Sequence, residues 1–174
     1  MKKAILYINQ FFGQIGGEAE AYQKPFIEQG ARGNAQAFVP LLEDAEIVAT
    51  IVCGDNYYAE NMDEVKEFVE EKITELSPDL IIAGPAFNAG RFGIACADIC
   101  KDAVQKMHVE AITGLYEENP AVEMYRKDIY ILKVGKSAAA MRKAVKLMAG
   151  FANKLLAGKE IGLPKEEGYY PKGK

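Results

Sequence analysis

Short runs of apolar residues alternate along the chain with longer segments in which apolar residues recur at helical spacing. The short runs contain few polar interruptions, which is typical of strands covered on both faces of a parallel sheet. We expect such strands at residues 4–8, 46–52, 80–83, 109–113 and 129–134. Helices are expected after Asn61, Arg91 and Ser137, where the apolar residues fall on one face of a helix.

Strands that alternate with helices predict one architecture. Right-handed crossovers make consecutive strands parallel and place helices on both faces of the sheet. The predicted fold is therefore α/β, with a doubly wound, mostly parallel five-stranded sheet flanked by helices, a three-layer sandwich of the flavodoxin-like or Rossmann-like kind. We expect residues 1–157 to form a single α/β domain. Residues 158–174 are rich in Gly, Pro and Lys without an apolar period, and predict an extended C-terminal arm or linker.

The loops that follow the expected strands carry glycines and polar side chains. In a sheet of this kind, ligands bind outside the carboxyl ends of the strands, near the switch in strand order. We expect four loops to meet at one such rim, namely 9–17, 54–58, 84–91 and 114–119. The first belongs to a longer polar segment, 9–32, and connections of that length are usually lids, binding loops or disordered segments.

The stretch from Leu80 to Cys100 has the order of strand, glycine-containing turn and helix found in βαβ units. Backbone N–H groups at the helix start, with the guanidinium of Arg91 beside them, predict a seat for an anion or carboxylate. The turn has neither the G-x-G-x-x-G fingerprint nor the P-loop ending, and similar turns occur in α/β proteins without a ligand. Both interpretations stay open on the turn alone.

Composition and charge argue against several classes of function. The chain has 174 residues, 49% of them hydrophobic, a net charge of −4 and a pI near 5.2. It has no basic cluster suited to nucleic acid, and no apolar run approaches the roughly 18 residues of a membrane span. The start of the chain also lacks the features of a signal peptide, so we expect a cytoplasmic protein.

The cysteines and the histidine offer little for a metal or redox site. Cys53, Cys96 and Cys100 form no C-x-x-C pair, and together with His108 they are a poor ligand set for zinc. Cys96 and Cys100 fall on the apolar face of a helix, where structural thiols are more common than redox-active ones. We therefore expect no metal in this chain.

Five longer segments resemble one known family. They are residues 7–18, 53–61, 83–96, 115–127 and 166–173. In this order they resemble the amino-terminal part of the selenoprotein B subunit of glycine/sarcosine/betaine reductase, the protein B family. The resemblance is spread through essentially the whole chain, and several ordered motifs are more specific than a single glycine loop.

The resemblance implies an oxidoreductase role in anaerobic amino-acid fermentation. In that family the complex reductively deaminates glycine, sarcosine or betaine to acetyl phosphate. A pyruvoyl-bearing subunit helps to bind substrate in the glycine case, a selenocysteine of protein B attacks the substrate's α-carbon, and selenoprotein A receives the carboxymethyl group. The expected partners are therefore a small amino-acid-like substrate and the other reductase subunits, while homo-oligomerisation stays open.

One departure from the family limits what this chain can do. The family's selenocysteine-x-x-cysteine motif lies later in the subunit, and this chain has neither that motif nor a C-x-x-C replacement. None of its cysteines should inherit the nucleophile's role. No cofactor is expected in this chain, and the pyruvoyl group and selenocysteine are expected on other parts of the complex. The chain is then either an amino-terminal fragment of a longer subunit or a stand-alone homologue without the redox half.

Loop position and side-chain chemistry suggest individual roles that the resemblance does not supply. We expect Arg91 and the backbone after Gly90 to bind the substrate carboxylate. The other expected substrate-binding residues are Asn88, Asp55 and Asn56, which would orient the substrate, Asn9, Gln10, Gly16 and Gly17, which would form a closing loop, and Tyr116. No catalytic residue is assigned. The candidates are Glu117, which could hold the amine or carry a proton, and Cys53.

Two other interpretations compete with a substrate-binding domain. In one, the rim is a non-catalytic subunit-docking module of a reductase complex, and its contacts are the aromatic residues Phe11, Phe12, Phe87, Tyr57 and Tyr58. In the other, the chain is a complete small enzyme of the racemase or isomerase kind that uses the thiol of Cys53. A single thiol without a second one argues against this last interpretation.

Overall fold

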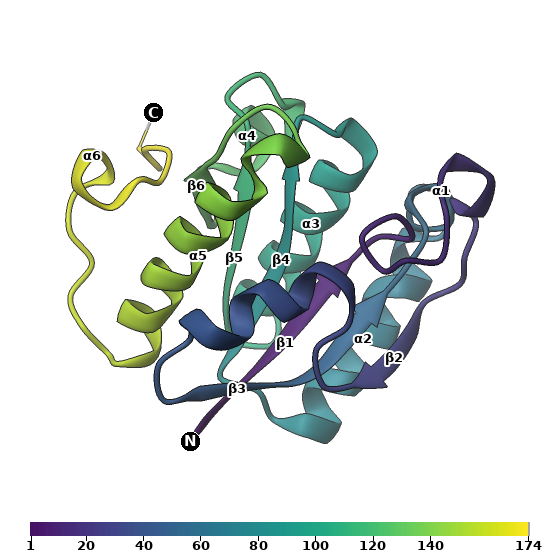
Figure 1. The fold of residues 1–174 in the computed structure, drawn as a ribbon, viewed down its shortest axis with the longest axis horizontal. Coiled ribbons are helices and arrows are strands. Elements are labelled where there is room, and N and C mark those ends of the chain that lie inside the picture. The colour runs from purple at the N-terminus through teal and green to yellow at the C-terminus, as the bar shows by residue number, and fades with distance from the viewer. Residues whose placement is uncertain (174) are drawn as a thin grey trace.

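The computed structural model describes residues 1–173 and confirms the predicted α/β fold (Figure 1). A six-stranded sheet has the order β2-β3-β1-β4-β5-β6. The strands are β1 (Lys2–Ile8), β2 (Phe26–Gln29), β3 (Ala45–Val52), β4 (Leu80–Phe87), β5 (Glu110–Leu115) and β6 (Tyr130–Lys133). Neighbouring strands are parallel except β2, which pairs antiparallel with β3 at one edge.

Helices cover both faces of the sheet and complete the three layers (Figure 1). One face carries α1 (Asp55–Glu60), α2 (Met62–Leu76), α3 (Gly90–Gln105) and α4 (Pro120–Tyr125). The other carries the 3-10 helix η2 (Gly33–Leu41) and α5 (Met141–Leu156). The 3-10 turns η1 (Glu18–Glu20) and η3 (Ala138–Ala140) and the short helix α6 (Pro164–Glu167) lie in connections and in the tail.

The central strand β1 shows why the apolar runs are uninterrupted. Ile5 and Tyr7 belong to the core on the α2–α3 side, whereas Ala4 and Leu6 belong to the core on the α5 side. All four side chains are buried because both faces of the strand are covered. From Ala4 to Ile8 the strand has no solvent-facing side, and this part of its sequence therefore lacks the polar alternation of a half-exposed strand.

The structure corrects the predicted sheet at two places. Residues 26–29, within a segment expected to be a loop, form a sixth strand. Its Glu28 and Gln29 are polar and exposed, so the sequence contains no apolar run from which this strand could be predicted. Strand β4 does not end at Ala83 but continues to Phe87, with an irregular register against β5. Helix α3 accordingly begins at Gly90.

The C-terminal tail, expected to be an extended arm or linker, folds back onto β6. Tyr169 forms an antiparallel bridge with Leu132, and backbone hydrogen bonds of 2.8 and 3.0 Å join residues 168–170 to residues 131–133. The hydroxyl of Tyr170 donates to the carbonyl of Leu115 at 2.8 Å, at the end of β5. These contacts hold the tail against the outer edge of the sheet.

One buried carboxylate joins the helices on the α2–α3 side. Asp98 of α3 accepts hydrogen bonds from the hydroxyls of Tyr58 in α1 and, at 3.4 Å, Tyr125 in α4. It also forms an ion pair with Lys66 of α2 at 3.2 Å. A single side chain thus contacts three neighbouring helices, and its removal would leave buried donors without an acceptor.

We predict that Asp98→Ala lowers the free energy of unfolding by about 2–4 kcal/mol, because two phenol hydroxyls and a lysine lose their shared partner. Urea denaturation followed by circular dichroism measures the change. The matched control is Glu123→Ala, which removes an ion pair with Arg126. The side chain of Glu123 is 87% exposed, so the free energy of unfolding should change by less than about 0.5 kcal/mol. Equal losses in the two variants would contradict the role of Asp98.

Candidate functional site

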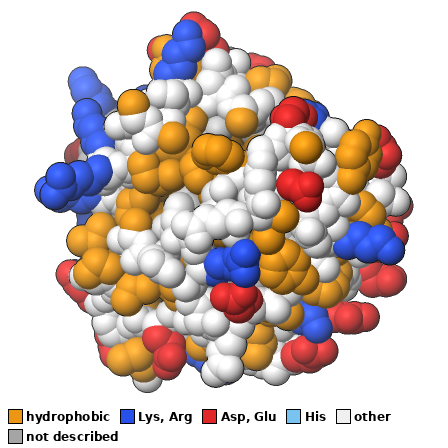
Figure 2. Space-filling view, turned by 45° about the vertical axis from the view of Figure 1, so that its right-hand side comes forward, with side chains coloured by type: hydrophobic (Ala, Val, Ile, Leu, Met, Phe, Trp, Pro, Cys, Tyr) orange, Lys and Arg blue, Asp and Glu red, His pale blue; other side chains and the backbone are white. Residues whose placement is uncertain are grey.

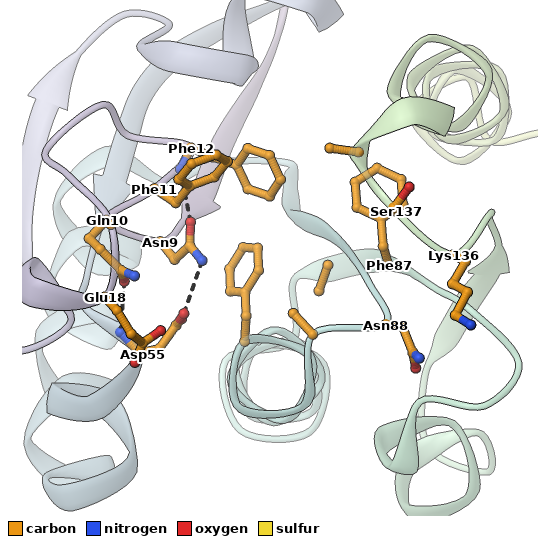
Figure 3. A pocket seen from close by; sticks show the side chains of 15 residues that line it. Asn9, Gln10, Phe11, Phe12, Glu18, Asp55, Phe87, Asn88, Lys136 and Ser137 are labelled. Carbon is orange, nitrogen blue, oxygen red and sulfur yellow. Dashed lines mark hydrogen bonds between the residues drawn. The ribbon is translucent and has the colours of Figure 1, made fainter.

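A pocket lies where the strand order reverses. From β1 the sheet continues through β3 on one side and β4 on the other, so the loops at the carboxyl ends of β1 and β4 separate at this point. The cavity there has a volume of about 280 Å³ and receives residues from the segments after β1, β3, β4 and β6. Its lining consists of Asn9, Gln10, Phe11, Phe12, Gly17, Glu18, Asp55, Ala86, Phe87, Asn88, Ala89, Phe92, Lys136, Ser137 and Ala138 (Figure 3).

One wall of the pocket is a hydrogen-bonded group of Asn9, Gln10 and Asp55. The side-chain amide of Asn9 donates to Asp55 Oδ2 at 3.0 Å, and Asn9 Oδ1 accepts from the backbone N–H of Phe12 at 2.9 Å (Figure 3). Gln10 Oε1 accepts from the backbone N–H of Asp55 at 3.0 Å. These contacts link the end of β1 to the start of α1 and fix the position of the Asp55 carboxylate.

The start of α1 is fixed by the long loop after β1. The carbonyl of Ala21 accepts hydrogen bonds from the N–H groups of Asn56 at 2.8 Å and Tyr57 at 3.1 Å. A Cβ atom at Gly54 would collide with that same carbonyl oxygen, so glycine is required for this close approach. The long polar segment after β1, expected to be a lid, a binding loop or disordered, thus carries part of the support for Asp55.

Asp55 is a carboxylate in an unusual environment. Asp55 is only 8% exposed, and it makes no ion pair within residues 1–173. Burial raises the pKa of Asp55 above its usual range, and the hydrogen bond from Asn9 and the positive charge of Arg91 act against that rise. The carboxylate can therefore hold a proton or a positively charged group more readily than an exposed one.

The floor of the pocket is aromatic. The ring of Phe12 lies 6.4 Å from that of Phe87 and 5.9 Å from that of Phe92, measured between centroids. Phe87 and Phe92 are buried, whereas Phe11, whose ring contacts that of Phe12, is 60% exposed. This floor excludes water from one side of the cavity and strengthens electrostatic interactions at its polar walls.

Asn88, Lys136 and Ser137 form the wall opposite Asp55 (Figure 3). The backbone N–H of Asn88 donates to the carbonyl of Lys136 at 3.2 Å, which joins the segment after β4 to that after β6. The hydroxyl oxygen of Ser137 accepts from the N–H of Ala139 at 3.4 Å and so caps η3. The pocket therefore has the acidic residues Asp55 and Glu18 on one wall and Lys136 on the other.

Arg91 lies at the rim, next to two of the expected loops. Its Nη2 contacts both carboxylate oxygens of Glu18, at 2.9 and 3.1 Å, and its Nη1 donates to the side-chain oxygen of Asn56. The side chain is 46% exposed and does not line the pocket. The segments after β1 and β3 meet at Arg91, whereas the loop after β5 contributes Tyr116 and Glu117 to another cavity. The charge of Arg91 is engaged by Glu18, so its expected role toward a carboxylate stays a prediction.

The structure separates the expected site residues into three groups. Asn9, Gln10, Gly17, Asp55 and Asn88 line the pocket. Gly16, Asn56, Gly90 and Arg91 lie near it without lining it. Tyr116 and Glu117 line a second cavity of about 250 Å³ with Lys133, Val134 and Tyr170.

Cys53 is fully buried at the end of β3. Burial raises its pKa to about 12, so the thiol is protonated at neutral pH and is a poor nucleophile. Burial also raises the pKa of Cys96 and Cys100. The described residues 1–173 contain no cluster of His, Cys, Asp and Glu side chains that could hold a metal ion.

Lys136 and Ser137 are pocket residues that the sequence analysis did not select. They follow residues 129–134, and the rule that ligands bind after strand ends could have identified them. Among the helices of residues 1–173, none has the length and apolar character needed to cross a bilayer.

Comparisons with known proteins identify the family. The family model described as "Glycine/sarcosine/betaine reductase selenoprotein B" matches residues 1–174. No solved structure gives a significant match.

Three curated relatives show how far the similarity extends. The chain is 46% identical over 172 residues to the glycine reductase complex component B subunit gamma of Carboxydothermus hydrogenoformans, covering 98% of this chain and 40% of the relative. It is 45% identical over 174 residues, 100% of this chain and 40% of the relative, to the betaine reductase complex component B subunit beta of Peptoclostridium acidaminophilum. With the sarcosine reductase complex component B subunit beta of that organism it shares 45% identity over 172 residues, 98% of this chain and 39% of the relative.

The chain thus spans about 40% of the length of the first two relatives. Identity at this level over nearly all of its residues, together with the match of the family model, gives one conclusion: the chain belongs to the glycine/sarcosine/betaine reductase selenoprotein B family.

Proposed function

We propose that this chain is the amino-terminal part, or a shortened homologue, of a protein-B-type reductase subunit, and that its rim pocket binds a small amino-acid-like substrate for reductive deamination. The observation that supports this most directly is the pocket at the switch in strand order, with opposite charges on facing walls. The relatives' names refer to reductases of glycine, betaine and sarcosine. All three molecules carry one ammonium and one carboxylate group.

The volume of the pocket favours a ligand of this size. At about 280 Å³ it lies just below the range of roughly 300–1,000 Å³ typical of small-molecule sites. Seven of its fifteen lining residues have polar side chains, which come from separate loops, while phenylalanine rings supply most of the apolar surface. A pocket of this kind binds a compact molecule with charged ends and an apolar carbon between them.

The redox step belongs to other parts of the complex in this proposal. The three cysteine thiols of the described residues are buried, and burial raises the pKa of each, so none of them is placed to act as a nucleophile. The contribution of this chain is then to bind and orient the substrate and to contact other reductase subunits. Those subunits, a pyruvoyl-bearing protein and selenoprotein A among them, are the partners we propose.

The alternative of a docking module is less well supported by the exposed surface. Of the aromatic residues expected to contact a partner, Tyr58 and Phe87 are buried, and only Phe11 belongs to the strongly exposed large apolar residues. Figure 2 shows one face of the molecule, on which apolar side chains are broken up by polar, charged and backbone groups. The aromatic residues of the rim thus mainly form the inside of a pocket.

A titration tests the proposal. We expect glycine, sarcosine or betaine to shift amide NMR signals of the pocket loops in the isotope-labelled 174-residue chain. Asn88→Ala should weaken that binding about fivefold, because it removes a hydrogen-bonding group from the wall. The control is Glu117→Gln in the second cavity, expected to leave the affinity within about twofold. Failure of all three molecules to bind would contradict a substrate pocket and favour docking.

Arg91→Ala tests whether this arginine binds substrate or holds the rim. Because its guanidinium pairs with Glu18 at a partly exposed position, we expect less than about a fivefold loss of affinity and faster amide hydrogen exchange in residues 13–20. A loss of more than about tenfold with unchanged exchange would instead show direct contact with the substrate carboxylate.

A further inference from the structure

The two polar walls of the pocket carry complementary charges that the protein itself does not pair. Asp55 stands on the wall built from the segments after β1 and β3, and Lys136 on the wall after β6 (Figure 3). Neither makes an ion pair with another residue in the part of the chain that the structure describes. The aromatic floor lies between them.

The environment of the Asp55 carboxylate favours binding of a cation. Its carboxylate is buried, and the side chains that bond to it or to its backbone, Asn9 and Gln10, are neutral amides. Arg91 is close enough for its charge to act on Asp55, yet its hydrogen bonds go to Glu18 and Asn56. Because a buried carboxylate without a cation costs free energy, a ligand that supplies a positive charge would be stabilised here.

Lys136 offers the complementary group on the other wall. Its side chain is exposed, and its carbonyl is held by the backbone N–H of Asn88. Ser137 places a hydroxyl beside it, and the side chain of Asn88 adds an amide. An ammonium, a hydroxyl and an amide are all donors suited to a carboxylate.

Building on the proposed function, we infer that the pocket binds its zwitterionic substrate in one orientation, with the ammonium group at Asp55 and the carboxylate at Lys136 and Ser137. The α-carbon then lies over the phenylalanine floor. This assignment gives the carboxylate a partner other than Arg91 and the amine a partner other than Glu117. Arg91 acts in it as a positioning residue that holds the Glu18 loop.

Half-ligands locate the two ends in the unaltered chain. Acetate carries only the carboxylate, and methylammonium only the cation. We expect acetate to shift the amide NMR signals of residues 136–139, and methylammonium those of residues 9–10 and 55. The opposite assignment of shifts would overturn the orientation, as would shifts from both probes at the same wall.

Two variants test the same orientation through affinity. In the unaltered chain, glycine should bind more tightly than either half-ligand. Asp55→Asn should weaken glycine binding about tenfold or more while leaving acetate binding nearly unchanged, and Lys136→Met should weaken glycine while leaving methylammonium unchanged. The control Lys133→Met removes an equivalent charge from the second cavity and should change none of these affinities. Amide spectra confirm that each variant is folded.

The outcomes separate the two proposals. If the unaltered chain binds glycine, sarcosine or betaine but both variants keep its affinity, the substrate pocket stands and the orientation is overturned. If the unaltered chain binds none of the three molecules, the proposed function fails, and the orientation fails with it.

Discussion

The parallel pairing of β1 with β3 on one side and β4 on the other is the constraint on which the candidate site depends. It sends the loops after β1 and β4 in different directions and leaves a gap between their first residues. Asn9 and Asn88 occupy the two sides of that gap. The covered faces of the sheet hold the strands in place, and the strand ends in turn fix where the polar loops begin.

Burial on both faces explains why the parallel core was predictable. The buried stretch of a strand such as β1 is apolar on both faces, and buried stretches with few polar residues also mark β3, β4 and β5, where any charged residues lie near the strand starts. The strand β2 obeys no such requirement, because it lies at an edge and its last two residues are exposed. Residues 26–29 form a strand because they pair with β3. A local sequence pattern cannot predict this pairing.

The candidate site was predictable only in part, for a related reason. Polar residues after buried strands identify Asn9, Gln10, Asp55 and Asn88, since the sheet geometry alone brings them together. The same rule reaches Lys136 and Ser137, but a serine before a helix is equally typical of a helix cap, a role that Ser137 also has. Whether Arg91 is free to bind a ligand depends on the position of Glu18, with which it forms an ion pair. Glu18 lies in an irregular loop, and no periodic sequence pattern predicts the conformation of that loop.

The contacts of the tail with β6 have a consequence for how copies of this chain can meet. An uncovered edge strand offers its backbone groups to another sheet. At β6 those groups are already bonded to residues 168–170, and at the opposite edge β2 is short and presents the charged pair of Glu28 and Arg32. A continuous intermolecular β-sheet is therefore disfavoured at both edges, which favours helical or loop surfaces for any self-association.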